Sequence, residues 1–179
     1  MKPEFKNRGN EEVELKDGRK VWLSRSPAAV LVVLGIYKDN IFVLIEKRSQ
    51  TMTDAPGEYA LISGYIDYNE TSWEACVREA YEETGLNILQ YKSLFINDDY
   101  SQPFFVNSDP QENRQNIALN HCIIIDFSKK LPKEIESYTN EEISEVKWLP
   151  IEYVQKYKFA FKHKERIYQA IEKYQHMLI

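Results

Sequence analysis

The sequence has little cysteine and no long apolar run. Its 179 residues include only two cysteines, Cys76 and Cys122, which cannot make a disulfide framework or a four-ligand zinc site. No apolar run approaches the roughly 20 residues that span a bilayer, and the N-terminus lacks the apolar stretch of a signal peptide. We therefore expect a cytoplasmic protein with no membrane partner.

Positive charge is also in short supply. The chain carries 23 Lys plus Arg against 28 Asp plus Glu, a net charge of −5. Proteins that bind nucleic acid neutralise its phosphates with basic residues. Because this chain is acidic overall, we expect no nucleic-acid partner. The hydrophobic fraction of 43% is sufficient for a core and excludes wholesale disorder. At about 150 residues per domain, the length predicts one domain with a modest extension.

The pattern of apolar and turn residues predicts a fold of mixed α/β or α+β type. Apolar residues at 13–15 and 21–23 flank Asp17-Gly18, which predicts a β-hairpin with a type I′ turn. Further strands are predicted at residues 28–37, 41–45, 59–66, 90–96, 117–127 and 145–149. We expect residues 1–26 to form an N-terminal extension with this hairpin, and residues 27–179 to form one domain with helices packed on a central mixed sheet.

Three segments are predicted to be helical. The most distinct covers residues 71–84 and stops at Gly85, a residue suited to the left-handed position after a helix. A second follows Pro150 at residues 151–157, and a third runs from about residue 163 to the C-terminus. Residues 97–116 contain two prolines and show no clear period, so we expect a long loop there. Loops of that length in a compact domain are usually functional or disordered.

Three glutamates crowd onto one side of the helix predicted at residues 71–84. At about 100° per residue, Glu79, Glu82 and Glu83 lie within about one turn of each other, and their like charges repel. A divalent cation would reverse the sign of that interaction, and hard cations such as Mg²⁺ take oxygen ligands. A solvated acidic face is the ordinary meaning of such a cluster, so the cluster alone leaves both interpretations open. A different side is apolar and faces a core; its residues are Trp73, Cys76, Val77, Ala80 and Thr84.

A spaced pattern surrounds these glutamates. Gly64 is followed by five residues, Glu70, seven residues, and then Arg-Glu-Ala-Tyr-Glu-Glu-Thr-Gly-Leu at 78–86. This resembles the Nudix box at every fixed position: glycine, glutamate, Arg-Glu, an aliphatic, Glu-Glu, glycine and an aliphatic. Seven fixed positions at roughly 6% residue frequency give a chance match on the order of 10⁻⁶ or less. Weaker resemblance extends over about residues 27–149.

The resemblance implies an enzyme that hydrolyses a nucleoside diphosphate linked to another moiety, with Mg²⁺ or Mn²⁺ as cofactor. Metal ions neutralise the phosphate oxygens, lower the pKa of a bound water and align its attack. By resemblance, Glu79 and Glu83 are the first candidates for metal ligands. Glu82 comes next, and the Gly64 carbonyl is a possible contributor.

Other residues complete the implied catalytic set of Glu82, Glu142 and Arg78. Arg78 and Glu70 are expected to fix the geometry of the box, although a purely structural salt bridge would explain Arg78 equally well. In several family members a glutamate outside the box, shortly before a Trp-containing strand, supplies a further ligand or the general base. Glu141 and Glu142 precede Trp148 at a suitable distance, and Glu142 is the preferred candidate, with an exposed loop acid as the alternative.

Substrate selection is expected from residues outside the box. Arg48 is a candidate partner for a phosphate, with an exposed arginine at a strand end as the alternative. Aromatic residues can stack on a base, although burial in a core is their commoner fate. The candidates are Tyr59, Phe104, Tyr65 and Phe105. His121 lies within an apolar strand and is expected to be a core residue, with a catalytic histidine as the alternative. Cys76 lies on the buried face of its helix and is expected to pack in the core.

Two short stretches bear on the substrate. Residues 101–105, Ser-Gln-Pro-Phe-Phe, are similar to a Ser-Gln-Pro-Trp-Pro-Phe stretch of NADH pyrophosphatases, but the likeness ends after the proline. Residues 159–163 are similar to a Phe-Asp-His-like segment of ADP-ribose-type Nudix proteins, with Lys162 where an aspartate often stands. An ADP-ribose-like nucleotide is therefore the favoured substrate.

Several alternatives stay open beside this one. NADH and oxidised nucleoside triphosphates would be cut by the same chemistry, whereas a Nudix-like sensor would bind a nucleotide sugar without cutting it. Such sensors often lose glutamates of the box, which are all present here. By analogy with ADP-ribose-type relatives, a homodimer using the N-terminal hairpin is also expected.

Overall fold

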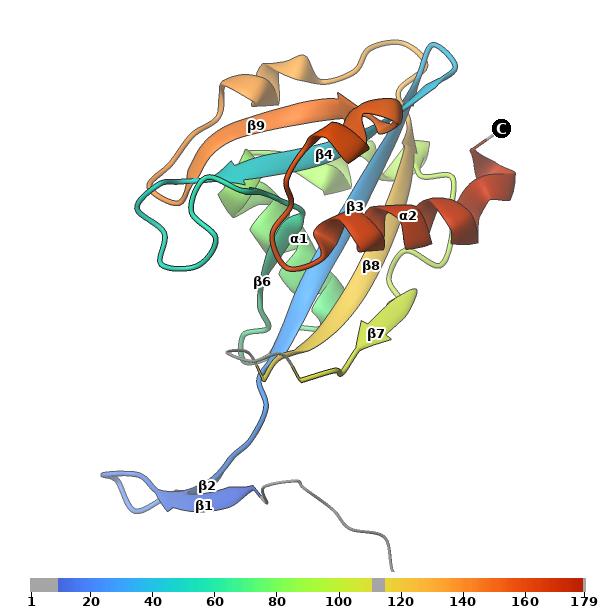
Figure 1. Ribbon diagram of the computed structural model, residues 1–179. Helices are drawn as coiled ribbons and strands as arrows, with labels where there is room; N and C mark the ends of the chain where they lie inside the picture. The colour runs from blue at the N-terminus through green and yellow to red at the C-terminus, as the bar shows by residue number, and fades with distance from the viewer. Residues whose placement is uncertain (1–9, 111–114, 179) are drawn as a thin grey trace, which may run out of the picture.

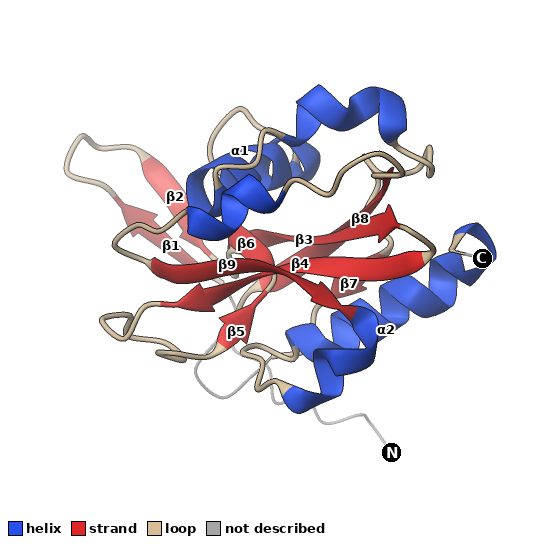
Figure 2. Ribbon diagram, turned by 90° about the horizontal axis from the view of Figure 1, so that it is seen from above, coloured by secondary structure: helices blue, strands red, loops and turns tan. Residues whose placement is uncertain are grey.

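The computed structural model describes residues 10–110 and 115–178, and residues 1–9, 111–114 and 179 lie outside the description. A central mixed sheet forms the body, and five of its strands lie side by side in the order β5-β4-β3-β8-β7 (Figures 1 and 2). β3 and β8 run parallel, and the other pairings are antiparallel, including β6 with β3 and β9 with β4. The strands are β3 (Pro27–Tyr37), β4 (Asn40–Arg48), β5 (Tyr59–Ala60), β6 (Ile62–Tyr65), β7 (Phe105–Asn107), β8 (Ile117–Asp126) and β9 (Ile143–Pro150).

Helices cover both faces of this sheet, as predicted. α1 (Ser72–Thr84) lies on one face and α2 (His163–Tyr174) on the other, as Figure 2 shows. Successive side chains of a strand point to opposite faces, so β3 supplies both cores. Leu31 and Val33 belong to the core under α1, whereas Val32 and Leu34 belong to the core under α2. None of the helices in the described part of the chain has the length and apolar character needed to cross a membrane.

Local sequence explains where α1 begins and ends. The Thr71 side chain accepts a hydrogen bond from the Glu74 N–H, and the Glu74 carboxylate accepts one from the Thr71 N–H, which is a capping box. At the other end Gly85 adopts the left-handed conformation with φ of 71°. The helix boundaries predicted from the sequence are therefore confirmed to within one residue. These boundaries set the spacing at which α1 presents its glutamates.

The N-terminal hairpin is present, but its turn differs from the prediction. β1 (Glu11–Glu14) and β2 (Lys20–Leu23) pair antiparallel and extend away from the sheet (Figure 1). Gly18 has a positive φ but Asp17 does not, and the Gly18 N–H donates to the Leu15 carbonyl. The loop is thus a type I turn followed by a left-handed glycine, a three-residue connection. The two-residue turn with both φ values positive lies instead at Lys38 and Asp39, between β3 and β4.

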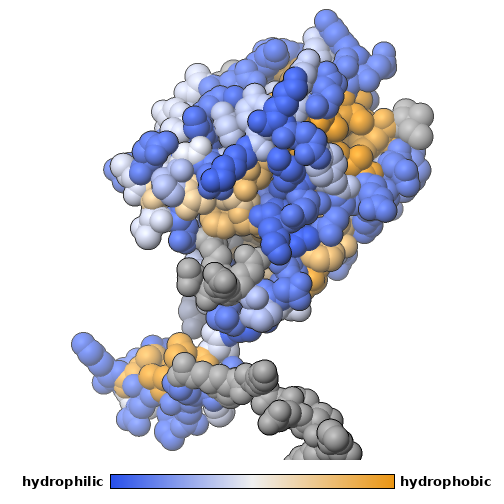
Figure 3. All heavy atoms as spheres, in the orientation of Figure 1, coloured by the Kyte–Doolittle hydropathy of each residue, from blue (hydrophilic) through white to orange (hydrophobic). Residues whose placement is uncertain are grey.

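Apolar side chains of the hairpin are exposed to solvent. Figure 3 shows several of them on the part of the molecule that stands apart from the body. Trp22 is 66% exposed and Leu23 60% exposed, and Val13, Leu15 and Val21 are exposed as well.

One further prediction of regular structure was wrong, and one was confirmed as a 3₁₀ helix. Residues 90–96 are not a strand: η1 (Ile88–Leu94) is a 3₁₀ helix, and only Phe95 forms a β-bridge, to Ile125. The backbone of this segment forms local hydrogen bonds, such as the one from the Gln90 N–H to the Asn87 carbonyl. It does not pair along β8 as a strand would. The helix predicted at residues 151–157 is present as the 3₁₀ helix η3 (Ile151–Lys156).

Two other segments were predicted only approximately. Residues 59–66 form two strands, β5 and β6, because the chain leaves β4 and pairs next with β3. The predicted loop at residues 97–116 contains the short strand β7, and its residues 111–114 are outside the description. The remaining elements are η2 (Lys133–Ser137) and η4 (Gln175–Met177).

Candidate functional site

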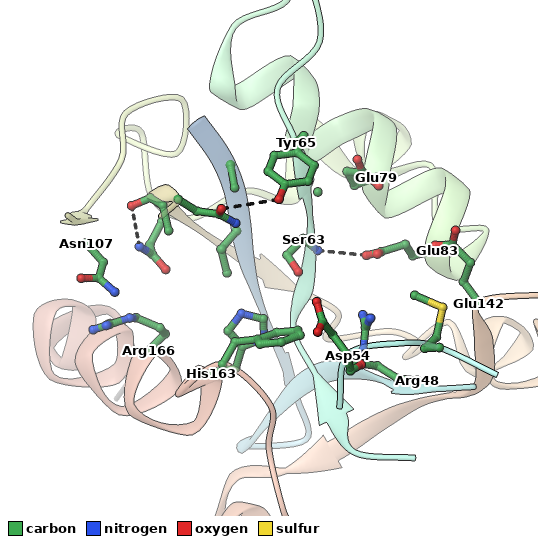
Figure 4. Close-up of a pocket in the computed structure, with 18 of the residues that line it drawn as sticks. Arg48, Asp54, Ser63, Tyr65, Glu79, Glu83, Asn107, Glu142, His163 and Arg166 are labelled. Carbon is green, nitrogen blue, oxygen red and sulfur yellow. Dashed lines mark hydrogen bonds between the residues drawn. The ribbon is translucent and has the colours of Figure 1, made fainter. Parts of the chain in front are cut away.

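A cavity of about 430 Å³ lies between the start of β3, β6, α1 and the start of α2 (Figure 4). Glutamates line one end of it: Glu79 and Glu83 from α1, and Glu142 from the loop before β9. Two arginines also line the cavity, Arg48 at the end of β4 and Arg166 on α2. The tertiary fold therefore gathers box residues with residues distant in the sequence around a single space.

Arg78 ties the acidic residues of the box together. Its guanidinium donates to Glu70 at 2.7 Å and to Glu79 at 2.6 Å, and it reaches Glu82 at 3.0 Å. It also donates to the Tyr65 carbonyl at 2.9 Å, so one side chain links α1 to the end of β6. The hydrogen bonds from Arg78 hold the pKa of Glu70 below its ordinary value. Arg78 thus offsets the repulsion among the glutamates and fixes the loop that leads into the helix.

Gly64 leaves room for the Glu79 carboxylate. A Cβ atom at residue 64 would overlap the carboxylate oxygens of Glu79, so no other residue fits without moving that side chain. Burial raises the pKa of Glu79 above its ordinary value, although the hydrogen bond from Arg78 acts in the other direction. The glycine of the box and its second glutamate are therefore spatial partners.

Glu83 and Glu46 form a buried carboxyl pair beneath the cavity. Glu83 is 7% exposed and accepts a hydrogen bond from the Ser63 N–H at 2.9 Å. Glu46 on β4 is fully buried, and in the described chain neither of its carboxylate oxygens has a donor. Burial raises the pKa of Glu46 to about 8, and burial together with the charge of Glu46 raises the pKa of Glu83. Glu46 was not among the predicted site residues, because its only signal in the sequence is an acid that follows an apolar strand run.

The loop that carries Glu142 is anchored to the end of α1. Asn140 donates from its side-chain amide to the Glu82 carbonyl at 3.0 Å and accepts a hydrogen bond from the Glu142 N–H at 2.8 Å. Tyr138 donates to the same Glu82 carbonyl at 2.9 Å. These bonds hold Glu142 at the cavity. The Glu82 side chain itself is 56% exposed, contacts Arg78 and does not line the cavity.

The predicted substrate residues divide into two groups. Arg48 and Tyr65 line the cavity; Arg48 donates to the Asp54 carbonyl at 2.9 Å and lies over the Phe161 ring. Tyr59 and Phe104 do not line it. The Tyr59 hydroxyl donates to Glu145 at 2.8 Å, and the Phe104 ring packs against Tyr174.

The two residues expected in the core are buried and do not line the cavity. His121 contacts the Ser72 hydroxyl at 2.9 Å and the Tyr100 carbonyl at 3.1 Å. Burial lowers the pKa of His121, and Cys76 packs in the core under α1.

Most of the wall that α2 provides was not predicted from the sequence. His163 accepts a hydrogen bond from the Leu61 N–H at 2.9 Å, and Arg166 and Phe161 lie beside it in the cavity wall. The weak resemblance at residues 159–163 was the only signal for this wall. Asn107, Asn116 and Asn120 come from the predicted loop and β8, where no pattern marked them.

The oxygen-rich end of the cavity has the donors that a hard divalent cation requires. Among the described residues, no three His, Cys, Asp or Glu side chains are gathered closely enough to hold an ion as they stand. The available donors are nevertheless all oxygens, and the Glu46 carboxyl group is buried against Glu83 with no hydrogen-bond donor from any other described residue. A buried carboxylate without a hydrogen-bond donor is costly, and a cation would satisfy it. The residues present therefore fit Mg²⁺ or Mn²⁺.

Comparison with known proteins identifies the family. The model of the NUDIX domain family matches residues 25–171, so the chain belongs to the Nudix family. An ADP-ribose pyrophosphatase of Methanocaldococcus jannaschii is 29% identical over 155 residues, covering 87% of this chain and 79% of that protein.

Solved structures agree on the fold. The NUDIX domain of Shewanella oneidensis NrtR, in complex with ADP ribose, superposes with a TM-score of 0.60 and 19% identity over 84% of this chain and 89% of that one. A MutT/nudix family protein from Enterococcus faecalis gives a TM-score of 0.64 and 19% identity over 87% of this chain and 64% of that one. At this identity the likeness extends to the fold alone.

Proposed function

We propose that this protein is a metal-dependent pyrophosphohydrolase that cleaves the diphosphate of a nucleoside diphosphate linked to another moiety, with an ADP-ribose-like nucleotide as the favoured substrate. The observation that carries the proposal is the buried carboxyl pair of Glu46 and Glu83, which lies under a cavity that Glu79 and Glu142 also line. The relative from Methanocaldococcus jannaschii, an ADP-ribose pyrophosphatase, supports the choice of substrate class.

The charges of the cavity suit a diphosphate. Glu79 and Glu83, with Glu46 beneath them, would hold Mg²⁺ or Mn²⁺, and the Gly64 carbonyl is a further possible ligand. The bound metal would neutralise phosphate oxygens and lower the pKa of a water molecule. Arg48 lines the same end of the cavity, and its charge acts on Glu46, so it is positioned to receive a phosphate oxygen.

Glu142 is the candidate general base. Its loop is fixed to α1 through Asn140, and its carboxylate is exposed at the cavity, where it can accept a proton from an attacking water. In this proposal Arg78 and Glu82 do not contact the substrate directly. Arg78 orients Glu79 and Glu70, and Glu82 shares the Arg78 guanidinium without reaching the cavity.

A substrate panel at fixed Mg²⁺ tests the proposal. The panel compares ADP-ribose, NADH, dinucleoside polyphosphates, nucleotide sugars and nucleoside triphosphates, with phosphate-containing products resolved by chromatography. We expect hydrolysis of ADP-ribose or a close analogue, abolished by EDTA. Glu83→Gln should lower turnover at least 100-fold, whereas Glu172→Gln, on the exposed side of α2, should leave it unchanged. Turnover of Glu83→Gln within about threefold of wild type would remove Glu83 from the metal site.

Non-catalytic binding is the main competing function. The box glutamates are all present, and an acid is available at the position of the base, which favours an enzyme over a sensor. Tight binding of a nucleotide sugar without turnover of any panel member would reverse that choice. A preference for NADH or for oxidised nucleoside triphosphates would keep the chemistry and change the substrate.

We also propose that the protein forms a homodimer and binds no nucleic acid. The exposed apolar side chains of the β1–β2 hairpin would pack against a second copy, since burying Trp22 and Leu23 removes apolar area from water. Light scattering of wild type and of Trp22→Ser tests this: we expect a dimer that the substitution weakens. A wild-type protein that is monomeric at all accessible concentrations would contradict it.

A further inference from the structure

Arg166 lies at the end of the cavity that is remote from the glutamates. Figure 4 shows Arg166 beside Asn107 on one side of the cavity, and Glu79, Glu83 and Glu142 on the other side, with Ser63 between them. Arg48 lies with the glutamates rather than with Arg166 (Figure 4). The cavity thus has a metal-binding end with its own arginine, and a second cationic end formed by α2.

The Arg166 side chain is held in place by two neighbours. Its guanidinium carbon lies 4.4 Å from the centre of the Phe105 ring, which covers one face of the group. One terminal nitrogen donates to the Gln169 side-chain oxygen at 2.6 Å. The residue as a whole is only 8% exposed. A long, flexible side chain is therefore already fixed in the wall before any ligand arrives, which reduces the entropy lost on binding.

Neither of these neighbours neutralises the charge of Arg166. Phe105 and Gln169 are uncharged, and no carboxylate in the described part of the chain forms an ion pair with Arg166. The acids Asp54 and Asp109 also line the cavity, but they are not among the partners of this guanidinium. A largely buried cation with no counter-charge is costly, and an anionic ligand would offset that cost.

We propose that Arg166 is a specificity-determining residue that binds a second anionic group of the substrate, a phosphate separate from the diphosphate that is cut. This inference rests on the proposed function. It narrows the substrate class from ADP-ribose-like nucleotides to those with an additional phosphate on one of the two linked moieties. Arginine suits this role because its planar guanidinium can donate two parallel hydrogen bonds to phosphate oxygens.

Binding without metal tests the inference independently of hydrolysis. Calorimetry in EDTA compares ADP-ribose with ADP-ribose 2′-phosphate and ADP-ribose 1″-phosphate, which place the extra phosphate on opposite moieties. We expect one of the two to bind about tenfold more tightly than ADP-ribose, which also identifies the moiety at Arg166. Arg166→Met should abolish that difference while changing the affinity for ADP-ribose itself by less than about threefold.

Two further variants separate recognition from folding and from general charge. Arg166→Lys keeps the charge and should retain part of the preference. Lys164→Met removes one positive charge from the same helix at a residue that contacts the Gln155 carbonyl rather than the cavity, and should retain all of it. If neither phosphorylated compound binds more tightly than ADP-ribose, or if Arg166→Met weakens all three equally, the inference is wrong. If the wild-type protein shows this binding preference but hydrolyses none of the compounds, the proposed hydrolysis is wrong and the role of Arg166 in binding stands.

Discussion

The carboxyl groups of Glu46 on β4 and Glu83 on α1 face each other in the core beneath the cavity, and in the described chain Glu46 has no hydrogen-bond donor. Two neighbouring carboxylates without a cation repel each other, so the metal-free fold favours a proton on the pair. A divalent cation would take the place of that proton. The pair therefore links stability, pH and metal binding in one site.

The first prediction follows from the raised pKa values of this pair. In EDTA, the folded protein keeps a proton here that the unfolded chain releases above the ordinary glutamate pKa. The contribution of this pair to the free energy of unfolding should therefore be fully present below about pH 4.5. It should be lost as the pH rises through about 8. We expect Tm in EDTA to drop by several degrees between pH 5.5 and 8.5, measured by differential scanning fluorimetry.

Glu46→Gln should flatten that pH dependence, because it removes one of the two titrating groups. At pH 8.5, Mn²⁺ should raise Tm of the wild type and raise it less in Glu46→Gln. Glu172→Gln serves as the matched control, since it removes an exposed acid from α2. Identical pH profiles and identical Mn²⁺ responses for wild type and Glu46→Gln would contradict the role assigned to the pair.

The second prediction concerns Arg78. Arg78→Lys keeps the charge but loses the planar group that reaches Glu70, Glu79 and Glu82 together. We expect kcat/KM to fall about 10- to 100-fold, the range for residues that orient metal ligands. Arg19→Lys, in the exposed hairpin, is the control and should leave kcat/KM unchanged. Near-normal activity of Arg78→Lys would reduce Arg78 to a structural salt bridge.

The third prediction concerns the space at Gly64. Gly64→Ala places a methyl group where the Glu79 carboxylate lies, so Glu79 must move away from its position. We expect Mn²⁺ binding to weaken at least tenfold, measured by electron paramagnetic resonance of free Mn²⁺. Gly18→Ala changes a glycine in the hairpin turn and should leave Mn²⁺ affinity as it is. Unchanged Mn²⁺ affinity in a folded Gly64→Ala protein would show that Glu79 is not a ligand.

The fourth prediction separates base catalysis from metal binding. Glu142→Gln should lower kcat about 100-fold, with Mn²⁺ affinity kept within about threefold. The neighbouring Glu141→Gln is the control, because Glu141 does not line the cavity. Little change in kcat would remove Glu142 from the mechanism, and a large loss of Mn²⁺ affinity would make it a ligand instead.

The sequence by itself determined the local structure of the box and much of its chemistry. The capping box at Thr71 and the left-handed Gly85 are set by short-range hydrogen bonds and backbone preference, so α1 was predictable to within one residue. Helical periodicity then placed Glu79, Glu82 and Glu83 together, and the spacing from Gly64 to Leu86 was sufficient to indicate the family.

Only the tertiary structure decided what surrounds the box. Residues 90–94 lie in a 3₁₀ helix and not in the predicted strand, because neighbouring elements, not propensity, determine whether an apolar segment finds a strand partner. Glu46 and Arg166 are distant from the box in sequence. Glu46 is unusual only because the fold buries its carboxyl group against Glu83, and Arg166 only because the fold buries its charge beside the cavity with no ion-pair partner among the described residues. Burial and missing partners are properties of the folded chain. The sequence therefore identified the reaction class, and the structure identified the residues expected to select the substrate.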